Sequence, residues 1–291
     1  MRSTTPREKF RAVLTGSRCV FPGSVYDPIS ARIAEDLGFE IGMFAGSVAS
    51  MAVLGAPDLI VLTLTEFADQ ARRICRAGSL PLMVDADHGY GNALNVKRTV
   101  EELEVAGISG LSIEDTLLPR SFGSGGKAEL LSIEEGVGKM KAAVAGRSDP
   151  GLCIFGRTSA AGITGTGECI ARVKAYAATG VDAIFLVGVR DRPQLEAIAA
   201  EVSLPLMLGG PGPMLMDRDY LASRGVRICL QGHQPFAAGV QAVYATLKAL
   251  RDGVDPKQLP GLPSDALMKQ VTRNADYDSW TETFLERPPL Q

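Results

Sequence analysis

The 291-residue sequence has little of several features that mark particular classes of protein. Its formal net charge is only −3, and it has no basic stripe of the kind that nucleic-acid binding requires. No apolar stretch approaches the roughly 18–20 residues that span a bilayer, and the N-terminal segment has no apolar run of signal-peptide length. We therefore expect a cytoplasmic protein that binds neither nucleic acid nor membrane.

Cysteine and histidine are also scarce. The chain has two histidines and an odd number of cysteines without CxxC spacing, namely Cys19, Cys75, Cys153, Cys169 and Cys229. Most of these cysteines lie inside apolar runs, where an unpaired thiol packs as a small hydrophobic group. We expect buried free thiols, with neither disulfides nor a zinc site.

What the sequence does have is an alternation of short apolar runs and helical patterns. The eight runs are RCVFPG from Arg18, EIGMFAGS from Glu40, PLMVDAD from Pro81, GLSIED from Gly110, LCIFGRT from Leu152, DAIFLVG from Asp182, PLMLGG from Pro205 and RICLQGH from Arg227. Eight such units predict a (β/α)8 TIM-type barrel over residues 1–255, followed by a C-terminal helical arm over 256–291. A doubly wound open sheet is the alternative, although neither of the first two runs leads into the GxGxxG turn of its dinucleotide-binding form.

Carboxylates follow two neighbouring runs of this pattern. Asp85 and Asp87 share one face of the third predicted strand because side chains alternate with period two, and Glu114 ends the fourth. Three carboxylates this close repel each other unless a cation neutralises them, and an all-oxygen set suits Mg²⁺, with Mn²⁺ as a substitute. The alternative is that they cap the helices that follow.

Other polar residues also fall at predicted strand ends, where barrel enzymes carry their chemistry. Arg157 needs an anionic partner, which is either a substrate carboxylate or an internal ion pair with Glu114. Gly46 and Ser47 offer backbone N–H groups and a hydroxyl to a carboxylate. His233 is either a site residue or a core histidine.

Several segments, taken in order, resemble one known family over roughly residues 8–250. They are YDPISARIAEDLGFE, MFAGSVAS, VDADHGYGN, the IED of GLSIEDTLLP and the arginine of FGRT. The sequence resembles the isocitrate lyase and phosphoenolpyruvate mutase superfamily. The resemblance implies a barrel that binds magnesium and small 2-keto acids, and a homotetramer (a dimer of dimers) in which subunits exchange the last barrel helix.

The resemblance also implies roles for individual residues. By position, Asp85 is expected to be the principal metal anchor, with Asp87 and Glu114 completing the site partly through water. Asp58, in LGAPDLI, matches an acidic residue that some members use near the metal. Gly46 and Ser47 are expected to hold the C1 carboxylate of the substrate, and Arg157 to reach its carboxylate and keto oxygens. His88 is left as a helix-capping or supporting residue.

Departures from the family pattern reduce the number of superfamily reactions that this sequence is expected to catalyse. The carbon–carbon lyases use a cysteine-containing loop after the fourth strand, but the segment TLLPRSFGSGGKAEL has neither cysteine nor histidine. Phosphonomutases carry a histidine where this chain has Val187. The segments GSVAS, DADHGYGNALN, EDTLLP, LVGVRD and a late GH pair resemble the oxaloacetate decarboxylase branch, in which the late histidine, here His233, contacts substrate.

This resemblance implies Mg²⁺-dependent decarboxylation of oxaloacetate to pyruvate and carbon dioxide, through an enolate that the metal stabilises. Two kinds of alternative stay open. One is another reaction on the same scaffold, such as hydrolysis of a 2-keto acid or cleavage of a substituted malate. The other is a protein that binds a 2-keto acid without turnover.

Overall fold

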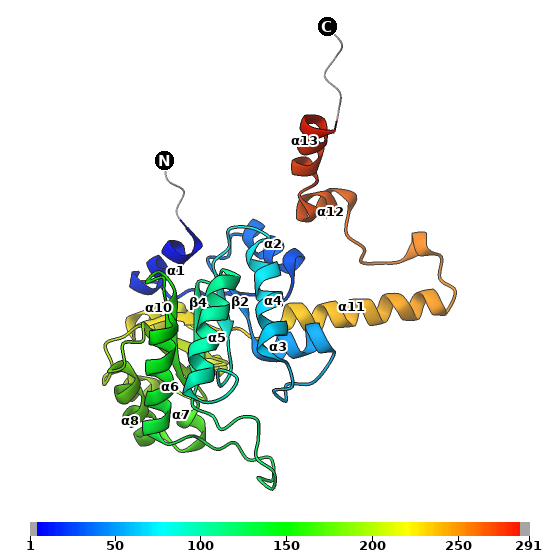
Figure 1. Ribbon diagram of the computed structural model, residues 1–291. Helices are drawn as coiled ribbons and strands as arrows, with labels where there is room; N and C mark the ends of the chain where they lie inside the picture. The colour runs from blue at the N-terminus through cyan, green and yellow to red at the C-terminus, as the bar shows by residue number, and fades with distance from the viewer. Residues whose placement is uncertain (1–4, 286–291) are drawn as a thin grey trace. The chain divides into compact units, whose positions relative to one another are not determined.

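The computed structural model describes residues 5–285, and its centre is a sheet of eight parallel strands in sequential order (Figure 1). The strands are β1 (Gly23–Ser24), β2 (Gly42–Phe44), β3 (Leu82–Asp85), β4 (Gly110–Glu114), β5 (Cys153–Thr158), β6 (Ala183–Val187), β7 (Leu206–Gly209) and β8 (Val226–Cys229). Strands β2 to β8 each overlap one predicted apolar run over most or all of their length, whereas β1 shares only Gly23 with the first run. The predicted (β/α)8 barrel is therefore confirmed, and the open doubly wound sheet is wrong because its strand order would not be sequential.

The barrel closes between its first and last strands through a sparse seam. Pro22 interrupts the first apolar run, so β1 retains only two residues, and Val20 ahead of it forms the bridge to β8. The Val20 amide donates to the Arg227 carbonyl at 2.9 Å, and the Cys229 amide donates to the Val20 carbonyl at 3.0 Å. A proline cannot donate to a ladder, which explains why the strand breaks here.

Helices follow the strands and cover the outside of the barrel. Those of the first unit are α1 (Pro6–Thr15), α2 (Pro28–Asp36), α3 (Gly46–Ala49), the π-helical turn η1 (Ser50–Leu54), α4 (Leu64–Cys75), α5 (Ala93–Ala106), α6 (Ile133–Gly146), α7 (Ala160–Ile163), α8 (Thr166–Ala177), α9 (Arg192–Ala199), the 3₁₀ turn η2 (Pro213–Leu215) and α10 (Arg218–Ser223). Local sequence sets their ends: Thr63 and Asn92 cap α4 and α5 with capping boxes, and Gly107 at φ 96° ends α5.

Helix α1 covers the amino end of the barrel. Its Phe10 is fully buried and packs edge-on against the ring of Phe155, with the centroids 6.0 Å apart. The Arg7 side chain donates to the carbonyl of Ile108 at 2.9 Å, just ahead of β4. With this end closed, the carboxyl ends of the strands are left to form a site.

All five cysteines are free thiols; Cys19, Cys153, Cys169 and Cys229 are buried as expected, and Cys75 is half-buried. Over residues 5–285 no helix is both long enough and apolar enough to cross a membrane.

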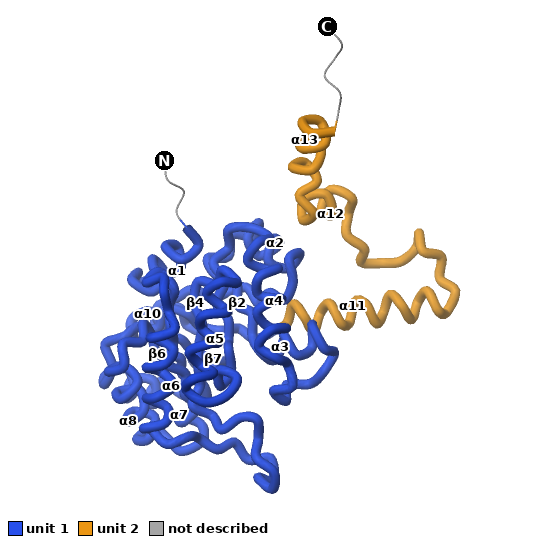
Figure 2. The backbone as a smooth tube through the Cα atoms, in the orientation of Figure 1, with its two compact units in different colours: residues 1–233 blue, residues 234–291 orange. Residues whose placement is uncertain are grey.

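The chain divides into two compact units, the first ending at His233 (Figure 2). The second contains α11 (Gln234–Arg251), the 3₁₀ turn η3 (Pro256–Gln258), α12 (Asp265–Thr272) and α13 (Asn274–Phe284). The sequence analysis placed the boundary after residue 255. The structural division comes earlier because α11, which has no buried residue, clusters with the C-terminal segments. Exchange of this helix between subunits stays a prediction.

Candidate active site

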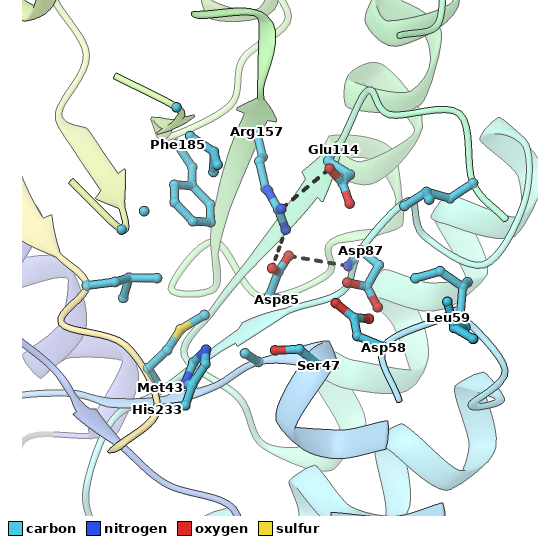
Figure 3. Close-up of a pocket in the computed structure, with 18 of the residues that line it drawn as sticks. Met43, Ser47, Asp58, Leu59, Asp85, Asp87, Glu114, Arg157, Phe185 and His233 are labelled. Carbon is cyan, nitrogen blue, oxygen red and sulfur yellow. Dashed lines mark hydrogen bonds and ion pairs between the residues drawn. The ribbon is translucent and has the colours of Figure 1, made fainter. Parts of the chain in front are cut away.

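The carboxyl ends of the strands surround a cavity of about 710 Å³ (Figure 3). Seven of the residues predicted for the site line it: Ser47, Asp58, Asp85, Asp87, Glu114, Arg157 and His233. They come from segments that are far apart in sequence and that the parallel barrel brings to one end. Figure 3 shows Arg157 reaching toward the acidic side chains, with His233 on another wall of the cavity.

Asp85 is the most extensively bound of these carboxylates. It ends β3, where the Ser112 hydroxyl of β4 donates to its Oδ1 at 2.8 Å and the Asp87 amide donates to the same oxygen at 3.3 Å. Its Oδ2 forms an ion pair with Arg157. Three donors from three segments therefore fix the orientation of this carboxylate toward the cavity.

Arg157 lies between two carboxylates. It pairs with Asp85 and also with Glu114, at 3.5 Å, and its guanidinium lies 5.3 Å from the centroid of the Phe185 ring. Burial alone lowers its pKa, but the surrounding carboxylates, Asp85 foremost, outweigh burial and raise the pKa above its usual value. Arg157, whose side chain is 16% exposed, is thus a permanent and largely buried cation. The internal ion pair considered from the sequence is present, and contact with a substrate stays a prediction.

Asp87 lies just beyond β3 in a left-handed conformation, with φ 48°. The Glu114 amide donates to its carbonyl at 2.8 Å, and its carboxylate lies directly over Gly46. A Cβ at Gly46 would be 2.6 Å from Oδ1 and 2.7 Å from Cγ of Asp87, too close for any side chain. Gly46 therefore lets the start of α3 approach the acidic cluster, while its predicted contact with a substrate carboxylate stays untested.

The acidic residues carry more negative charge than Arg157 balances. Burial, and then the charges of Asp85 and Glu114, raise the pKa of Asp87 well above its usual value. Burial also raises the pKa of Glu114, and burial with the nearby charge of Asp85 raises that of Asp58. Such shifts mean that ionising all of these carboxyl groups together costs free energy. An added cation would reduce this cost by offsetting the repulsion between the carboxylates.

The carboxylate oxygens of these acidic residues are suitable ligands for a divalent cation. Hard cations prefer carboxylate oxygens, and an acidic excess favours binding. Over residues 5–285, however, no three Asp, Glu, His or Cys side chains are grouped so that they could hold a metal ion as they stand. Arg157 also pairs with Asp85 Oδ2, so a cation that binds this oxygen has to displace the guanidinium.

His233 follows β8 and faces the cavity from another side. Its Nδ1 lies 2.9 Å from the hydroxyl of Ser24, at the end of β1, and no residue of the described range 5–285 hydrogen-bonds to its Nε2. Burial lowers the pKa of the imidazole, opposed by the charge of Asp85, so the ring is neutral near pH 7. Ser24 was not predicted for the site, although a polar residue directly after the first apolar run was an available signal.

Comparison with known proteins identifies the family. The family model for phosphoenolpyruvate phosphomutase matches residues 10–251. The chain belongs to the phosphoenolpyruvate phosphomutase family. A curated relative from Bradyrhizobium diazoefficiens, named oxaloacetate decarboxylase, is 62% identical over 93% of each chain.

Solved structures agree with this assignment. A phosphonopyruvate hydrolase complex with oxalate and Mg²⁺ aligns with TM-score 0.85 and 29% identity, covering 97% of this chain and 100% of that one. An oxaloacetate acetylhydrolase in complex with the inhibitor 3,3-difluorooxalacetate aligns with TM-score 0.84 and 28% identity, covering 96% and 97%.

Two polar residues of this phosphoenolpyruvate phosphomutase family member lie outside the cavity wall. His88 is buried beside the ring of Tyr90, with centroids 6.0 Å apart, and burial and the charge of Lys139 lower its pKa to about 4. Asp115, next to Glu114, points away from the cavity and accepts hydrogen bonds from Arg172 at 2.9 Å and Tyr176 at 2.7 Å. Alternation along the chain thus separates Glu114, in the site, from Asp115, which anchors α8.

The loop between β4 and α6 contributes a part of the site that the sequence analysis did not assign. Leu118, Pro119 and Arg120 line the cavity, and Val187 at the end of β6 lines it too. The sequence indicated only that this loop lacks cysteine and histidine. A basic residue beside a proline is too common a signal to place in a cavity without the fold.

Proposed function

We propose that this member of the phosphoenolpyruvate phosphomutase family is a carboxy-lyase that decarboxylates oxaloacetate to pyruvate and carbon dioxide with the help of a divalent metal. The relative at 62% identity bears the name oxaloacetate decarboxylase. The observation that carries the proposal is a buried cation, Arg157, and a neutral imidazole, His233, facing one acidic cavity. Such a site stabilises an enolate, and the neighbouring loop has no thiol or imidazole for the acid–base chemistry of a carbon–carbon lyase.

Asp85 and Asp87 would hold Mg²⁺, or Mn²⁺ in its place, with Glu114 and Asp58 contributing partly through water. The raised pKa values of Asp87, Glu114 and Asp58 support this, because a cation would relieve the repulsion that raises them. When bound, the metal supplies Lewis-acid polarisation of the keto oxygen.

The protein side chains supply binding and a fixed charge. Gly46 and Ser47 would orient the C1 carboxylate, and Arg157 would place its guanidinium beside the keto oxygen, where negative charge grows as the bond to the departing carboxylate breaks. The charge of Arg157 is permanent and already desolvated, so little reorganisation is required during the reaction.

His233 would act as a hydrogen-bonding group. A Ser24 hydroxyl that donates to Nδ1 selects the tautomer with a proton on Nε2, and this N–H would donate to the keto oxygen or the departing carboxylate. Water then supplies the proton that converts the enolate to pyruvate.

The deciding experiment is carbon-13 NMR of the products formed from labelled oxaloacetate by the purified protein with Mg²⁺. A protein-free sample with the same metal corrects for spontaneous decarboxylation, and a sample with chelator tests the metal requirement. Pyruvate and carbon dioxide formed well above the control are expected. Their absence would refute the proposal.

A second candidate is hydrolysis of oxaloacetate to oxalate and acetate, favoured by the fold match to an oxaloacetate acetylhydrolase. The same spectra separate the two, since oxalate and acetate have distinct carbon signals. If oxaloacetate yields no product, substituted malates are the next substrates, and saturable binding without any product would indicate a 2-keto acid binding protein.

We further propose a cytoplasmic homotetramer, a dimer of dimers in which α11 is exchanged between subunits. Exposed apolar side chains on this helix support an intermolecular contact, among them Val243, Tyr244 and Leu247 at 59%, 65% and 61% exposure. Light scattering during size-exclusion chromatography is expected to give four times the chain mass. A monomeric mass would contradict the assembly.

A further inference from the structure

Arg120 is a cavity residue on the loop between β4 and α6. It lines the cavity together with Leu118 and Pro119, which precede it. The base of the loop is fixed by two backbone hydrogen bonds of 2.8 Å, from the Leu117 amide to the Glu129 carbonyl and from the Leu131 amide to the Asp115 carbonyl. The loop therefore presents an exposed arginine to the cavity from a stem that is anchored to the barrel.

The two arginines of the cavity differ in what they contact. Arg157 is buried and already paired with Asp85 and Glu114. Arg120 is exposed and, within residues 5–285, forms no ion pair; its charge reaches the cavity and favours the ionised form of Asp58. Arg120 is thus a cavity cation whose guanidinium fork is available to a ligand.

Charge matching suggests what this fork recognises, and this step rests on the proposed function. Oxaloacetate is a dianion, and Arg157 with the acidic cluster serves its keto-acid end. The second carboxylate requires a positive group of its own elsewhere in the cavity. We propose that Arg120 binds this second carboxylate, the one that departs as carbon dioxide, and so selects dicarboxylates over keto acids with a single carboxylate.

The chemistry of the step predicts how such a contact affects the kinetics. The C3–C4 bond breaks and its electron pair forms the C2–C3 double bond of the enolate, while the keto oxygen takes the negative charge. C4 leaves as neutral carbon dioxide, and a proton from water later adds to C3. Because the departing group loses its charge, Arg120 binds the substrate more strongly than the transition state, and it contributes to KM and selectivity without raising kcat.

The test compares Arg120→Gln with Lys127→Gln, which removes an equal charge from an exposed residue of the same loop. KM and kcat for oxaloacetate are measured with Mg²⁺, and dissociation constants for malate and lactate by calorimetry. These two hydroxy acids differ by the far carboxylate. In Arg120→Gln we expect the KM for oxaloacetate and the dissociation constant for malate to rise about tenfold or more. The dissociation constant for lactate should stay within about twofold of the wild-type value, and kcat should not fall. Lys127→Gln is expected to match the wild type.

Equal weakening of malate and lactate in Arg120→Gln would overturn the proposal, because Arg120 would then act on the whole site. Unchanged dissociation constants for both malate and lactate in Arg120→Gln would also overturn the proposal. So would an equal change of these constants in Lys127→Gln. Unfolding midpoints show that each variant folds. The malate and lactate measurements need no turnover, so they decide the role of Arg120 even if the wild type forms no pyruvate, which would refute the proposed reaction alone.

Discussion

The two ends of the barrel use the same types of charged residue in opposite ways. At the amino end, Asp182 is paired with Arg11 at 2.9 Å and with Arg147, and Asp149 with Arg7. At the carboxyl end, Asp85, Asp87 and Glu114 share Arg157. A hydrogen bond from Arg7 lowers the pKa of Asp149, whereas burial and repulsion raise that of Asp87. Balanced charges hold the strands together, and unbalanced charges leave a site ready for a cation or a substrate.

Because the charges at the carboxyl end are unbalanced, we expect variants there to change activity and to leave stability nearly intact. Asp85→Ala is expected to have the largest effect, lowering kcat/KM at least about 1000-fold, since it removes the proposed metal anchor. The unfolding midpoint is expected to change little. Ser112 and the Asp87 amide lose an acceptor, but Arg157 keeps Glu114 as a partner and removal of the Asp85 charge relieves its repulsion with Asp87 and Glu114. Steady-state assays with varied Mg²⁺ measure the loss, and activity within about tenfold of the wild type would refute the role of Asp85.

Gly46→Ala tests the geometry of the carboxyl end without changing any charge. The added methyl group would overlap the Asp87 carboxylate, so Asp87 has to move and we expect kcat/KM and the apparent Mg²⁺ affinity to fall about 100-fold. Gly138→Ala is the matched control, because a Cβ at Gly138, within α6, meets nothing within 4 Å. This control is expected to keep full activity. An active Gly46→Ala enzyme would show that the position of Asp87 is not critical.

His233→Gln is expected to lower kcat about tenfold and to change KM less, as one hydrogen bond to the reacting groups is weakened. The neutral ring is the active form, and its pKa lies below the ordinary value of 6.5. Activity of the wild type should therefore fall at low pH as the ring gains a proton, with a midpoint below pH 6.5. The variant should lose this step from its pH–rate profile. An unchanged kcat and profile would make His233 a packing residue.

Asp182→Ala tests the amino end and is expected to have the smallest effect on activity. Arg11 and Arg147 both lose their partner, as does the Ile154 amide, which donates to Asp182 at 2.8 Å, so the free energy of unfolding should fall by about 3 kcal/mol. Glu201→Ala, which breaks the exposed pair with Lys174, is the control and should leave the free energy of unfolding nearly unchanged. Urea unfolding measures both. A large loss of kcat in folded Asp182→Ala would contradict the division between the two ends.

Sequence patterns predicted the barrel because each strand is a short apolar run and each run is followed by a helical pattern. They also predicted that Asp85, Glu114 and Arg157 lie close together, since parallel strands in a barrel end on the same side. The pairing of Arg157 with Asp85 was not predicted, because the choice between two carboxylates depends on side-chain geometry. Nor was the contact between Ser24 and His233, whose positions lie 209 residues apart.

Two other differences between the sequence-based predictions and the structure have similar physical causes. The cavity position of Arg120 depends on the path of a loop, which apolar periodicity does not describe. The boundary at residue 255 was set by helical pattern alone, whereas the compact unit ends at His233 because burial and contacts decide compactness.

The sparse seam between β1 and β8 has a consequence for motion. β1 is two residues long, and within residues 5–285 the Val20 bridge alone pairs this part of the chain with β8, so local opening there requires the loss of few backbone hydrogen bonds. Amide protons along the seam should exchange with solvent sooner than those of β4 and β5. We therefore expect larger fluctuations at Ser24 and His233, which lie beside this seam, than at Asp85 and Glu114, which lie on fully paired strands.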